Sequence, residues 1–432
     1  MTDRTPDTSG RWPRRPLWLR TVATILITAV VTFGATTYFE RGQASSNATL
    51  RALEAQPAFP RLLQALNLTR QYYVTDPNLN QMVEGAIAGA VAALGDPYSQ
   101  YFNATDYAAF NQQSSGQYGG IGVEVENQGS DIVVFRTFPG TPAADTAYQG
   151  APSGAPRGLQ PGDRMVAVGG KSIVGSPIQA ASNLIRGAAG SQVTVTVQRP
   201  DPSGGPAQQL TFVFTRANVV IPTATGTMLP GNVGYLNVNQ FTETTPDQVR
   251  TELAAMKKAG MKGLVLDLRN NPGGLVDSAL GVASQLMSNG LLTYLVDRQG
   301  NRQNYTITSG TTLGVPMVVL VNGFTASAAE ILSGAIQDRG LAPLVGTQTF
   351  GKGIVQRIYP LQGNTGLKIT VAHYYTPKGR DINKKGLTPD HVVQFPKTAS
   401  ANIIGDPSQD TPAADPQMAE ALSVLQGEMR GH

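Results

Sequence analysis

The 432-residue chain contains no cysteine and only three histidines, His373, His391 and His432. The absence of cysteine excludes disulfide bonds, thiol nucleophiles and cysteine-based zinc sites. No H-E-x-x-H or similar spacing occurs, and the acids Asp267, Asp277, Glu330 and Asp338 show no coherent ligand pattern. We therefore expect no metal and no cofactor, and candidate catalytic groups are oxygen and nitrogen side chains.

Charge is also scarce, since charged residues make up 14% of the chain and the net charge is +4. Residues 1–20 hold five arginines against two aspartates, so most of the positive charge lies there. The rest is nearly neutral, which argues against a nucleic-acid partner. A hydrophobic fraction of 41% predicts a folded protein, and its length predicts two or three domains at roughly 150 residues each.

Residues 21–39, TVATILITAVVTFGATTYF, are uncharged and follow the basic segment RWPRRPLWLR. This combination indicates a membrane-targeting element with residues 1–20 on the cytoplasmic side. Six threonines dilute the run, which leaves a cleaved signal peptide and a secreted product as the alternative. We favour an uncleaved single anchor that holds the remaining chain on the periplasmic side of the cell envelope.

The exported part shows three hydrophobic patterns in succession along the chain. Residues 59–101 show three- and four-residue spacing typical of two helices. Residues 116–217 are short β-branched runs with one helix near 180–186 and exposed loops at 148–157 and 199–209. Strands and helices alternate from 230 onward, which predicts a mostly parallel sheet, and a linker at 398–416 precedes a short terminal helix.

Ser327 follows a buried strand and a glycine turn in MVVLVNGFTASAAE, within the first turn of an expected helix. Such a serine is usually a helix cap. It can also be a nucleophile whose oxyanion faces the free amides of the helix terminus. From the residues alone, the cap is the commoner of the two.

A serine nucleophile needs a base, and the histidines are in unsuitable places: His432 ends the chain and His373 lies in an alternating strand. A lysine can serve if burial lowers its pKa from ~10.4 toward ~7. Lys352 fits, because the nearby chain is apolar at Phe350, Ile354, Val355 and Ile358 and lacks acids. Gln356, four residues on, lies on the same face of a strand or helix and is placed to hold the amine.

Two other glycine-rich segments invite comparison with anion-binding loops. Gly346, Gly351 and Lys352 match G-x-x-x-x-G-K, but Gly353 replaces the hydroxyl residue of a phosphate-binding loop. An NTPase is therefore a minor alternative. The turn Asn270-Asn271-Pro272-Gly273-Gly274 is either a plain strand-to-helix turn or a second place where amides converge on an anion.

Seven segments in order resemble the C-terminal processing peptidases, serine enzymes with an inserted PDZ module. They are VEGAIAGAVAALGDPYSQYF, YGGIGVEV, LQPGDRMVAVGGKSI, VLDLRNNPGGLVDSA, VNGFTASAAEILSGAIQD, GTQTFGKGIVQ and YYTPKGRDINKKGLTPD. The resemblance covers about residues 60–400 and implies an α+β and α/β multidomain fold. It comprises an N-terminal helical region, a PDZ β-module and a crotonase/ClpP-like α/β core.

The resemblance implies a set of roles for residues of this sequence. Ser327 is the expected nucleophile, Lys352 the general base, Gln356 the residue that orients the lysine and Asp338 a weaker auxiliary. The amides of Gly273 and Ala328 form the expected oxyanion site. Gly120, Ile121, Gly122 and Val123 form the expected PDZ loop for the carboxylate of a substrate tail with an apolar end. The insertion at 148–157 departs from the family pattern and puts the edge of the PDZ module in doubt.

We divide the chain into an anchor or signal sequence (1–43), a helical region (44–112), a PDZ domain (113–217), a catalytic core (218–397) and a linker with a terminal helix (398–432). Expected partners are protein or peptide substrates with free apolar C-termini and the membrane. The alanine-rich helices at 83–94 and 417–425 also suit packing in a homodimer. A catalytically silent PDZ scaffold at the membrane and an acyl-CoA enzyme on a crotonase-like sheet are the alternative functions.

Overall fold

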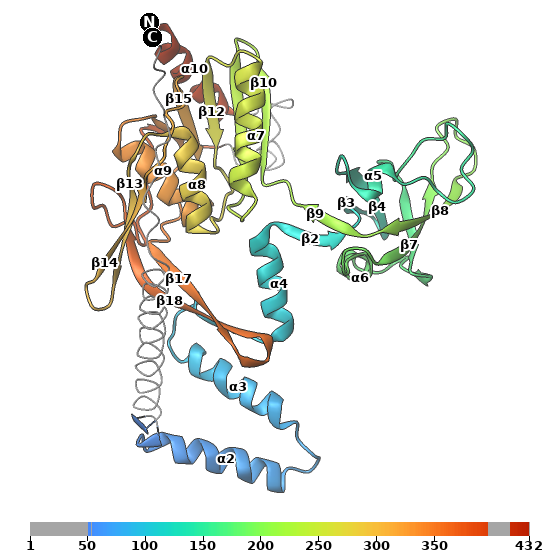
Figure 1. Ribbon diagram of the computed structural model, residues 1–432, viewed down its shortest axis with the longest axis vertical. Helices are drawn as coiled ribbons and strands as arrows, with labels where there is room; N and C mark the ends of the chain where they lie inside the picture. Colours follow the sequence, from blue (N-terminus) through green and yellow to red (C-terminus); the bar gives the residue numbers. More distant parts are fainter. Residues whose placement is uncertain (1–50, 53, 396–414, 432) are drawn as a thin grey trace, which may run out of the picture. The chain divides into compact units, whose positions relative to one another are not determined.

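The computed structural model describes residues 51–52, 54–395 and 415–431 (Figure 1). The expected membrane segment at 21–39 and almost all of the expected linker lie outside these residues. Within the described part of the chain, no helix has both the length and the apolar character needed to span a bilayer. The chain divides into two units, residues 1–89 and 90–432.

The two expected N-terminal helices are α2, Ala58–Tyr72, and α3, Leu79–Ala92. Helix α2 buries none of its side chains, and the only buried side chain of α3 is Val91. Large apolar side chains on these helices are exposed, namely Leu62, Leu63, Leu68, Tyr72, Leu79 and Val83. Short helices depend on a packed apolar face for stability in water, and this pair presents such a face as an exposed apolar surface.

The second unit contains the expected β-rich module. A short antiparallel pair, β2 (Gln117–Gly120) with β9 (Ala217–Val220), closes its two chain ends. The sheet runs β3 (Val123–Gln128), β4 (Asp131–Thr137), β5 (Arg164–Val168), β7 (Gln192–Arg199) and β8 (Gln208–Thr215), with β6 (Lys171–Ser172) on β5. Helices α5 (Pro142–Asp145) and α6 (Ile178–Ile185) cover a core rich in Val, Ile and Phe. Residues 148–157 are a loop and 200–207 a hairpin tip, as expected.

A six-stranded sheet forms the centre of the remaining part. Its order is β10 (Ala224–Leu229), β11 (Val233–Val238), β12 (Gly263–Asp267), β15 (Met317–Val321), β16 (Leu344–Gly346) and β19 (His391–Val392). Only the β10–β11 pair is antiparallel, and the other four pairs are parallel. Continuous apolar strands are typical of such a doubly covered sheet.

Alternate side chains of these strands enter two different cores. Leu264 and Leu266 face the helices α7 (Thr245–Lys258), α8 (Val276–Leu286) and α9 (Ala328–Asp338). Val265 faces the terminal helix α10, Pro416–Gly431, whose Met418, Ala421 and Leu425 are buried. The expectation that this helix packs against a second copy is therefore wrong for its apolar face, because the chain's own sheet covers that face.

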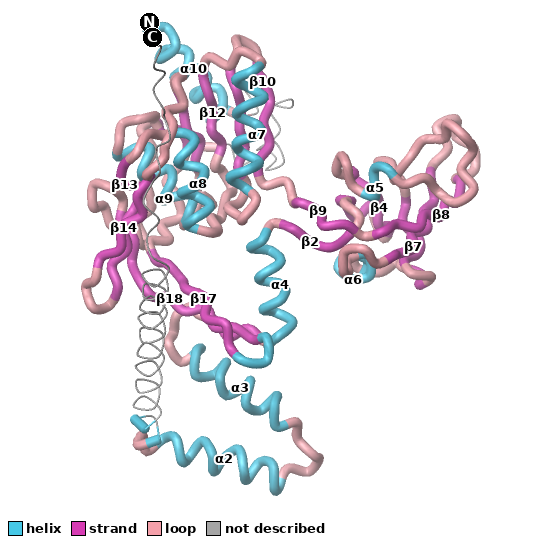
Figure 2. Tube along the Cα trace, in the orientation of Figure 1, coloured by secondary structure: helices cyan, strands magenta, loops and turns pink. Residues whose placement is uncertain are grey.

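A second, antiparallel sheet was not foreseen as a whole. Its central strand β18 (Thr365–Tyr375) pairs with β17 (Ile354–Leu361) and with β1 (Gln100–Phe102) and β13 (Gly290–Asp297), and β13 pairs with β14 (Arg302–Ile307). The turn η1 (Gln362–Asn364) joins β17 to β18, and Figure 2 shows the two strands running together as one long ribbon. Helix α4 (Ala104–Ser115) contacts this hairpin.

Candidate active site

Ser327 lies at the sharp turn between β15 and α9, in the position directly before the helix. Its backbone has φ 55° and ψ −118°, a conformation that residues other than glycine rarely adopt. Thr325 stabilises this turn. Its hydroxyl donates to the carbonyl of Leu268 and accepts from the amide of Asn322. Strained backbone of this kind is characteristic of functional positions, and a helix cap alone does not require it.

The carboxylate of Glu330, which is fully buried, organises this turn. Its Oε2 accepts hydrogen bonds from the backbone amides of Ser327 at 2.9 Å and Lys352 at 3.0 Å. Its Oε1 accepts from the hydroxyl of Thr349 at 2.5 Å and the amide of Gly351 at 2.8 Å. One side chain thus fixes both the candidate nucleophile and the candidate base, although the sequence suggested Glu330 only as an unconvincing metal ligand.

Tyr374 is a second residue that sequence reasoning missed. It is fully buried on β18, and its hydroxyl donates to the carbonyl oxygen of Ser327 at 3.2 Å. Burial raises its pKa well above the usual value, and the charge of Glu330 raises it further. The phenol therefore stays protonated and holds the serine backbone as a donor.

Lys352 precedes β17 and is half-buried. Burial lowers the pKa of its amine, and the like charge of Lys368 lowers it further, whereas Asp96 and Glu330 act in the opposite direction. The amine lies 4.6 Å from the ring centre of Tyr98. The expectation of a purely apolar shell is wrong: Phe350 is 53% exposed, and acids from distant segments approach the lysine.

Gln356 lies on β17 beside a register shift between Val355 and Gln356. Its side-chain amide donates to the hydroxyl of Thr370 at 3.1 Å. In the described part of the chain (51–52, 54–395 and 415–431), no hydrogen bond joins Gln356 to Lys352, and none joins the Ser327 hydroxyl to the Lys352 amine. Glu330 thus joins the backbones of Ser327 and Lys352, whereas the side chain of Gln356 is bonded to Thr370.

The expected oxyanion donors lie side by side. A Cβ built on Gly273 would come within 2.9 Å of the nitrogen of Ala328 and 2.7 Å of the Cβ of Ser327. The amide of Ala328 donates to no acceptor in the described residues. The amide of Gly273, in contrast, donates to Oδ1 of Asn271 at 2.8 Å. One of the two expected donors is therefore occupied by a side chain of its own loop.

The start of the loop that carries Gly273 is connected to the C-terminal helix by an ion pair. Arg269 is fully buried and its guanidinium pairs with Asp267 and, at 2.7 Å, with Asp415. Burial alone would lower the pKa of Arg269, but the two carboxylates outweigh it and the pKa is raised. Asp415 lies next to α10, so this helix and the Gly273 loop share a charged anchor.

Asp338 takes no part in the cluster. It is buried at the end of α9, where its carboxylate pairs with Arg380 at 2.5 Å and accepts from the amide of Lys378 at 2.8 Å. Both partners belong to the turn after β18. This geometry gives Asp338 a structural role, whereas the family resemblance had implied a weaker auxiliary role in catalysis.

The expected carboxylate loop of the β-module spans Gly120 to Val123. The carbonyl of Ile121 accepts from Ala143 at 2.7 Å and that of Gly122 from Phe138 at 2.9 Å. The amides of Ile121 and Gly122 find no acceptor in the described part of the chain. These two N–H groups are thus available for an anion.

The phosphate-loop alternative fails on the fold. Such a loop leads into a helix whose amino terminus binds the phosphates. Here the segment after β16 leads through Lys352 into strand β17. The resemblance to G-x-x-x-x-G-K is therefore a coincidence of spacing.

Comparisons with known proteins agree with these observations. Residues 232–393 match the model of peptidase family S41, residues 154–199 match the PDZ domain, and residues 25–106 match the N-terminal domain described as activating protease CtpB. The carboxy-terminal-processing protease of Bartonella bacilliformis is 36% identical over 336 residues, 76% of this chain and 73% of the relative. The carboxy-terminal processing protease CtpA of Bacillus subtilis is 31% identical over 376 residues, 87% of this chain and 77% of the relative.

Among solved structures, a putative S41 protease from Bacteroides fragilis aligns with a TM-score of 0.50. The alignment covers 84% of this chain and 96% of that one at 21% sequence identity. At this identity the likeness concerns the fold alone. It is consistent with the arrangement of sheets and helices described above.

Proposed function

The chain belongs to peptidase family S41, the carboxy-terminal processing proteases, and we propose that within this family of serine peptidases it uses Ser327 and Lys352 as a catalytic dyad. The observation that carries the proposal is the shared carboxylate oxygen of Glu330, which holds the backbones of both residues. The lowered pKa of Lys352 supports its role as the base, because a lysine accepts a proton only when neutral.

In the proposed reaction, neutral Lys352 takes the proton of the Ser327 hydroxyl as its oxygen attacks the scissile carbonyl carbon. The C–N bond then breaks, the proton passes to the leaving amine, and water hydrolyses the acyl-enzyme. Gln356 orients the lysine after its side chain leaves Thr370. The oxyanion receives hydrogen bonds from Ala328 and, once Asn271 releases it, from Gly273.

Substrates are proposed to be protein tails with apolar ends. The amides of Ile121 and Gly122, within the loop from Gly120 to Val123, would receive the terminal carboxylate while the tail lies beside a strand of the PDZ domain. The peptidase core is proposed to be crotonase-like, on the strength of its covered parallel sheet. Tail binding and cleavage then occur in two modules of one chain.

Two further parts of the proposal rest on the N-terminal region. The uncharged run at 21–39 after a basic segment favours an anchor in the cell envelope, with the secreted form as the alternative. The exposed apolar side chains of α2 and α3 favour self-association as a homodimer.

The decisive experiment measures cleavage of a protein with an apolar C-terminal tail by the wild type and by Ser327→Ala and Lys352→Ala. Both variants should lose at least ~10³-fold in kcat, with thermal melts close to that of the wild type. Lys258→Ala, on the exposed face of α7, is the matched lysine control. Turnover retained by either dyad variant would refute the mechanism.

The rival proposal is a catalytically silent tail-binding scaffold. A fluorophosphonate probe distinguishes the two, because it labels an activated serine covalently. Labelling of the wild type that disappears in Ser327→Ala supports the peptidase. Tail binding without any labelling or cleavage supports the scaffold.

A further inference from the structure

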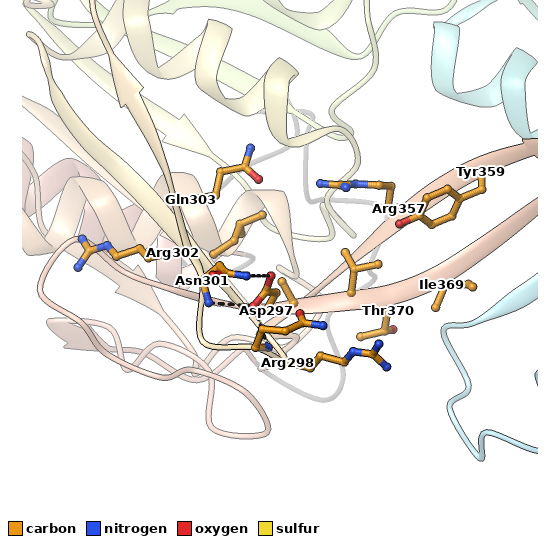
Figure 3. A pocket seen from close by; sticks show the side chains of 13 residues that line it. Asp297, Arg298, Asn301, Arg302, Gln303, Arg357, Tyr359, Ile369 and Thr370 are labelled. Carbon is orange, nitrogen blue, oxygen red and sulfur yellow. Dashed lines mark hydrogen bonds between the residues drawn. The ribbon is translucent and has the colours of Figure 1, made fainter. Parts of the chain in front are cut away.

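A groove of about 610 Å³ opens on the antiparallel sheet (Figure 3). Its walls come from the β13–β14 hairpin on one side and from β17 and β18 on the other. Its lining includes Leu295, Asp297, Arg298, Arg302, Arg357 and Val371. Thr370, which holds the side chain of Gln356, also lines this groove.

This groove continues toward the candidate active site. A neighbouring hollow of about 550 Å³ shares Leu295, Arg357 and Val371 with it. The neighbouring hollow is also lined by Gln356 and by Leu275, which directly follows the Gly273-Gly274 turn. The two hollows therefore form one channel that begins beside the oxyanion loop and ends between the hairpins.

One edge of β18 lacks a paired strand beside this channel. Strand β13 ends opposite Ala372 and strand β1 begins opposite Lys368 on the edge of β18 that β17 does not occupy. Residues 369–371 thus have no strand beside them on this edge, where the amide of Thr370 donates to the hydroxyl of Ser99 at 3.1 Å. The floor is apolar at Leu295 and Val371, which suits the side chains of an extended chain.

Charge is distributed unevenly along the channel. The groove between the hairpins is lined by Arg298, Arg302 and Arg357 with one acid, Asp297, whereas the neighbouring hollow, which Arg357 also lines, has the acids Glu243 and Asp277. Asp297 already accepts hydrogen bonds from Gln299 and Asn301, and these bonds lower its pKa. The carboxylate of Asp297 is consequently already hydrogen-bonded within its own turn.

The three arginines differ in what they contact. Arg302 donates to Asn304 at 2.8 Å and stacks on Tyr294, with its guanidinium 3.6 Å from the ring centre. The Nε of Arg298 donates at 2.9 Å to Gln299 in the favourable orientation of that amide. Arg357 has no hydrogen bond or ion pair to any described residue, and in Figure 3 its side chain extends from β17 across the cavity.

We propose that this channel binds the substrate polypeptide in extended form on one side of the scissile bond, and that Arg357 selects an aspartate or glutamate side chain there. A guanidinium and a carboxylate form short, charge-assisted and often bidentate hydrogen bonds. Arg357 is then a specificity-determining residue, separate from the recognition of the tail by the PDZ domain. The inference rests on the proposed peptidase function.

The test uses peptides that share one apolar C-terminal tail and one cleavage site. A single aspartate, or asparagine as its neutral match, occupies each position from five residues before to five residues after the scissile bond. For the wild type, kcat/KM should favour aspartate over asparagine about tenfold at one position, which corresponds to ~1.4 kcal/mol. The other positions should show ratios near one.

Variants then assign the preference to Arg357. Arg357→Gln should abolish the aspartate preference, and Arg357→Glu should favour lysine over asparagine at the same position. Arg250→Gln removes an exposed arginine of α7 and should keep the wild-type ratio. Gain of the lysine preference cannot result from misfolding.

The outcomes separate this inference from the function on which it rests. Equal cleavage of all peptides, or an aspartate preference that survives Arg357→Gln, overturns the role of Arg357 while the peptidase stands. No cleavage of any peptide by the wild type overturns the proposed function itself.

Discussion

The backbone amides of Ser327 and Lys352 donate to the same oxygen atom, Oε2 of Glu330, at 2.9 and 3.0 Å. The two residues belong to different segments, one before α9 and the other before β17. A buried carboxylate is costly unless it is fully hydrogen-bonded, and four donors meet that requirement here. The distance between the candidate nucleophile and base is therefore set by one side chain.

Glu330→Gln should disrupt this arrangement while it preserves the size of the side chain. The amide nitrogen of glutamine would face N–H donors that now meet a carboxylate oxygen, and each buried group left unsatisfied costs about 1–3 kcal/mol. We expect kcat to fall at least ~10-fold and the melting temperature to fall by several degrees. Steady-state kinetics and thermal melts measure both effects.

Glu126→Gln is the control for Glu330, because Glu126 lies exposed on β3. It should leave kcat and the melt unchanged. Wild-type kcat in Glu330→Gln would show that the dyad does not depend on the shared oxygen.

The pH dependence of kcat/KM should report the charge around Lys352. The amine is a base only when neutral, so activity rises with pH through its pKa, which lies below the usual 10.5. Removing the like charge with Lys368→Gln should raise that pKa and move the rising limb to higher pH. Removing the opposite charge with Asp96→Asn should lower the pKa and move the limb to lower pH.

These two shifts of opposite sign are the diagnostic result. Asp96 itself is a charged neighbour at neutral pH because hydrogen bonds from Ser99 and Thr370 lower its pKa against the effect of burial. If both variants move the limb in the same direction, or neither moves it, Lys352 is not the titrating base.

Gly273→Ala should abolish activity for a steric reason. The added Cβ would lie 2.7 Å from the Cβ of Ser327 and 2.9 Å from the nitrogen of Ala328, at a backbone φ of 98°. The loop must move, and the oxyanion donors lose their alignment, an effect worth 10²–10³-fold in kcat in comparable enzymes. Gly323→Ala, where no atom lies closer than 3.8 Å, is the matched control. Near-normal kcat in Gly273→Ala would place the oxyanion site elsewhere.

Much of the fold follows from periodicity, because buried parallel strands and amphipathic helices have distinct patterns. Local sequence also located the Ser327 turn and the Lys352 segment. Sequence patterns could not predict contacts between distant segments. Asp96 and Tyr98, for example, lie near Lys352 although more than 250 residues separate them from it in sequence. The role of Glu330 was missed although it lies three residues after Ser327, a spacing typical of a helix capping box. That spacing is the feature of the sequence from which the contact between Glu330 and Ser327 could have been predicted.

The exposed apolar helices at the N-terminus lead to a prediction about assembly. Leu63 of α2 is 53% exposed, and self-association would bury it. Leu63→Asp should convert a dimer into a monomer in light scattering coupled to gel filtration, because it places a charge in an apolar contact. Its neighbour Gln64 is also exposed, and Gln64→Asp should remain dimeric. A wild type that is monomeric at every concentration would contradict the proposal.

The ion pair between Arg269 and Asp415 predicts that the terminal helix supports both stability and catalysis. Both side chains are fully buried. Breaking a buried pair so that one charge is unpaired costs about 3–5 kcal/mol, and the loss of Asp415 leaves Arg269 paired with Asp267 alone, so the lower end of this range applies. Arg269 donates to Oδ2 of Asp415 and the amide of Met418 donates to Oδ1, so Asp415→Asn removes the charge and leaves one of these two donors facing an NH2 group. It should lower the unfolding free energy by about 3 kcal/mol in urea, and Asp415→Ala should lower it more.

Asp247→Asn breaks an exposed pair with Arg250 and should cost less than about 1 kcal/mol. Arg269 lies two residues before Asn271, which holds the amide of Gly273. Under conditions where Asp415→Asn is fully folded, kcat should therefore fall several-fold while KM changes little, since the oxyanion loop loses its fixed base. A normal kcat in that folded variant would limit the buried pair to a role in stability, because the loop would then keep its geometry without the charge of Asp415.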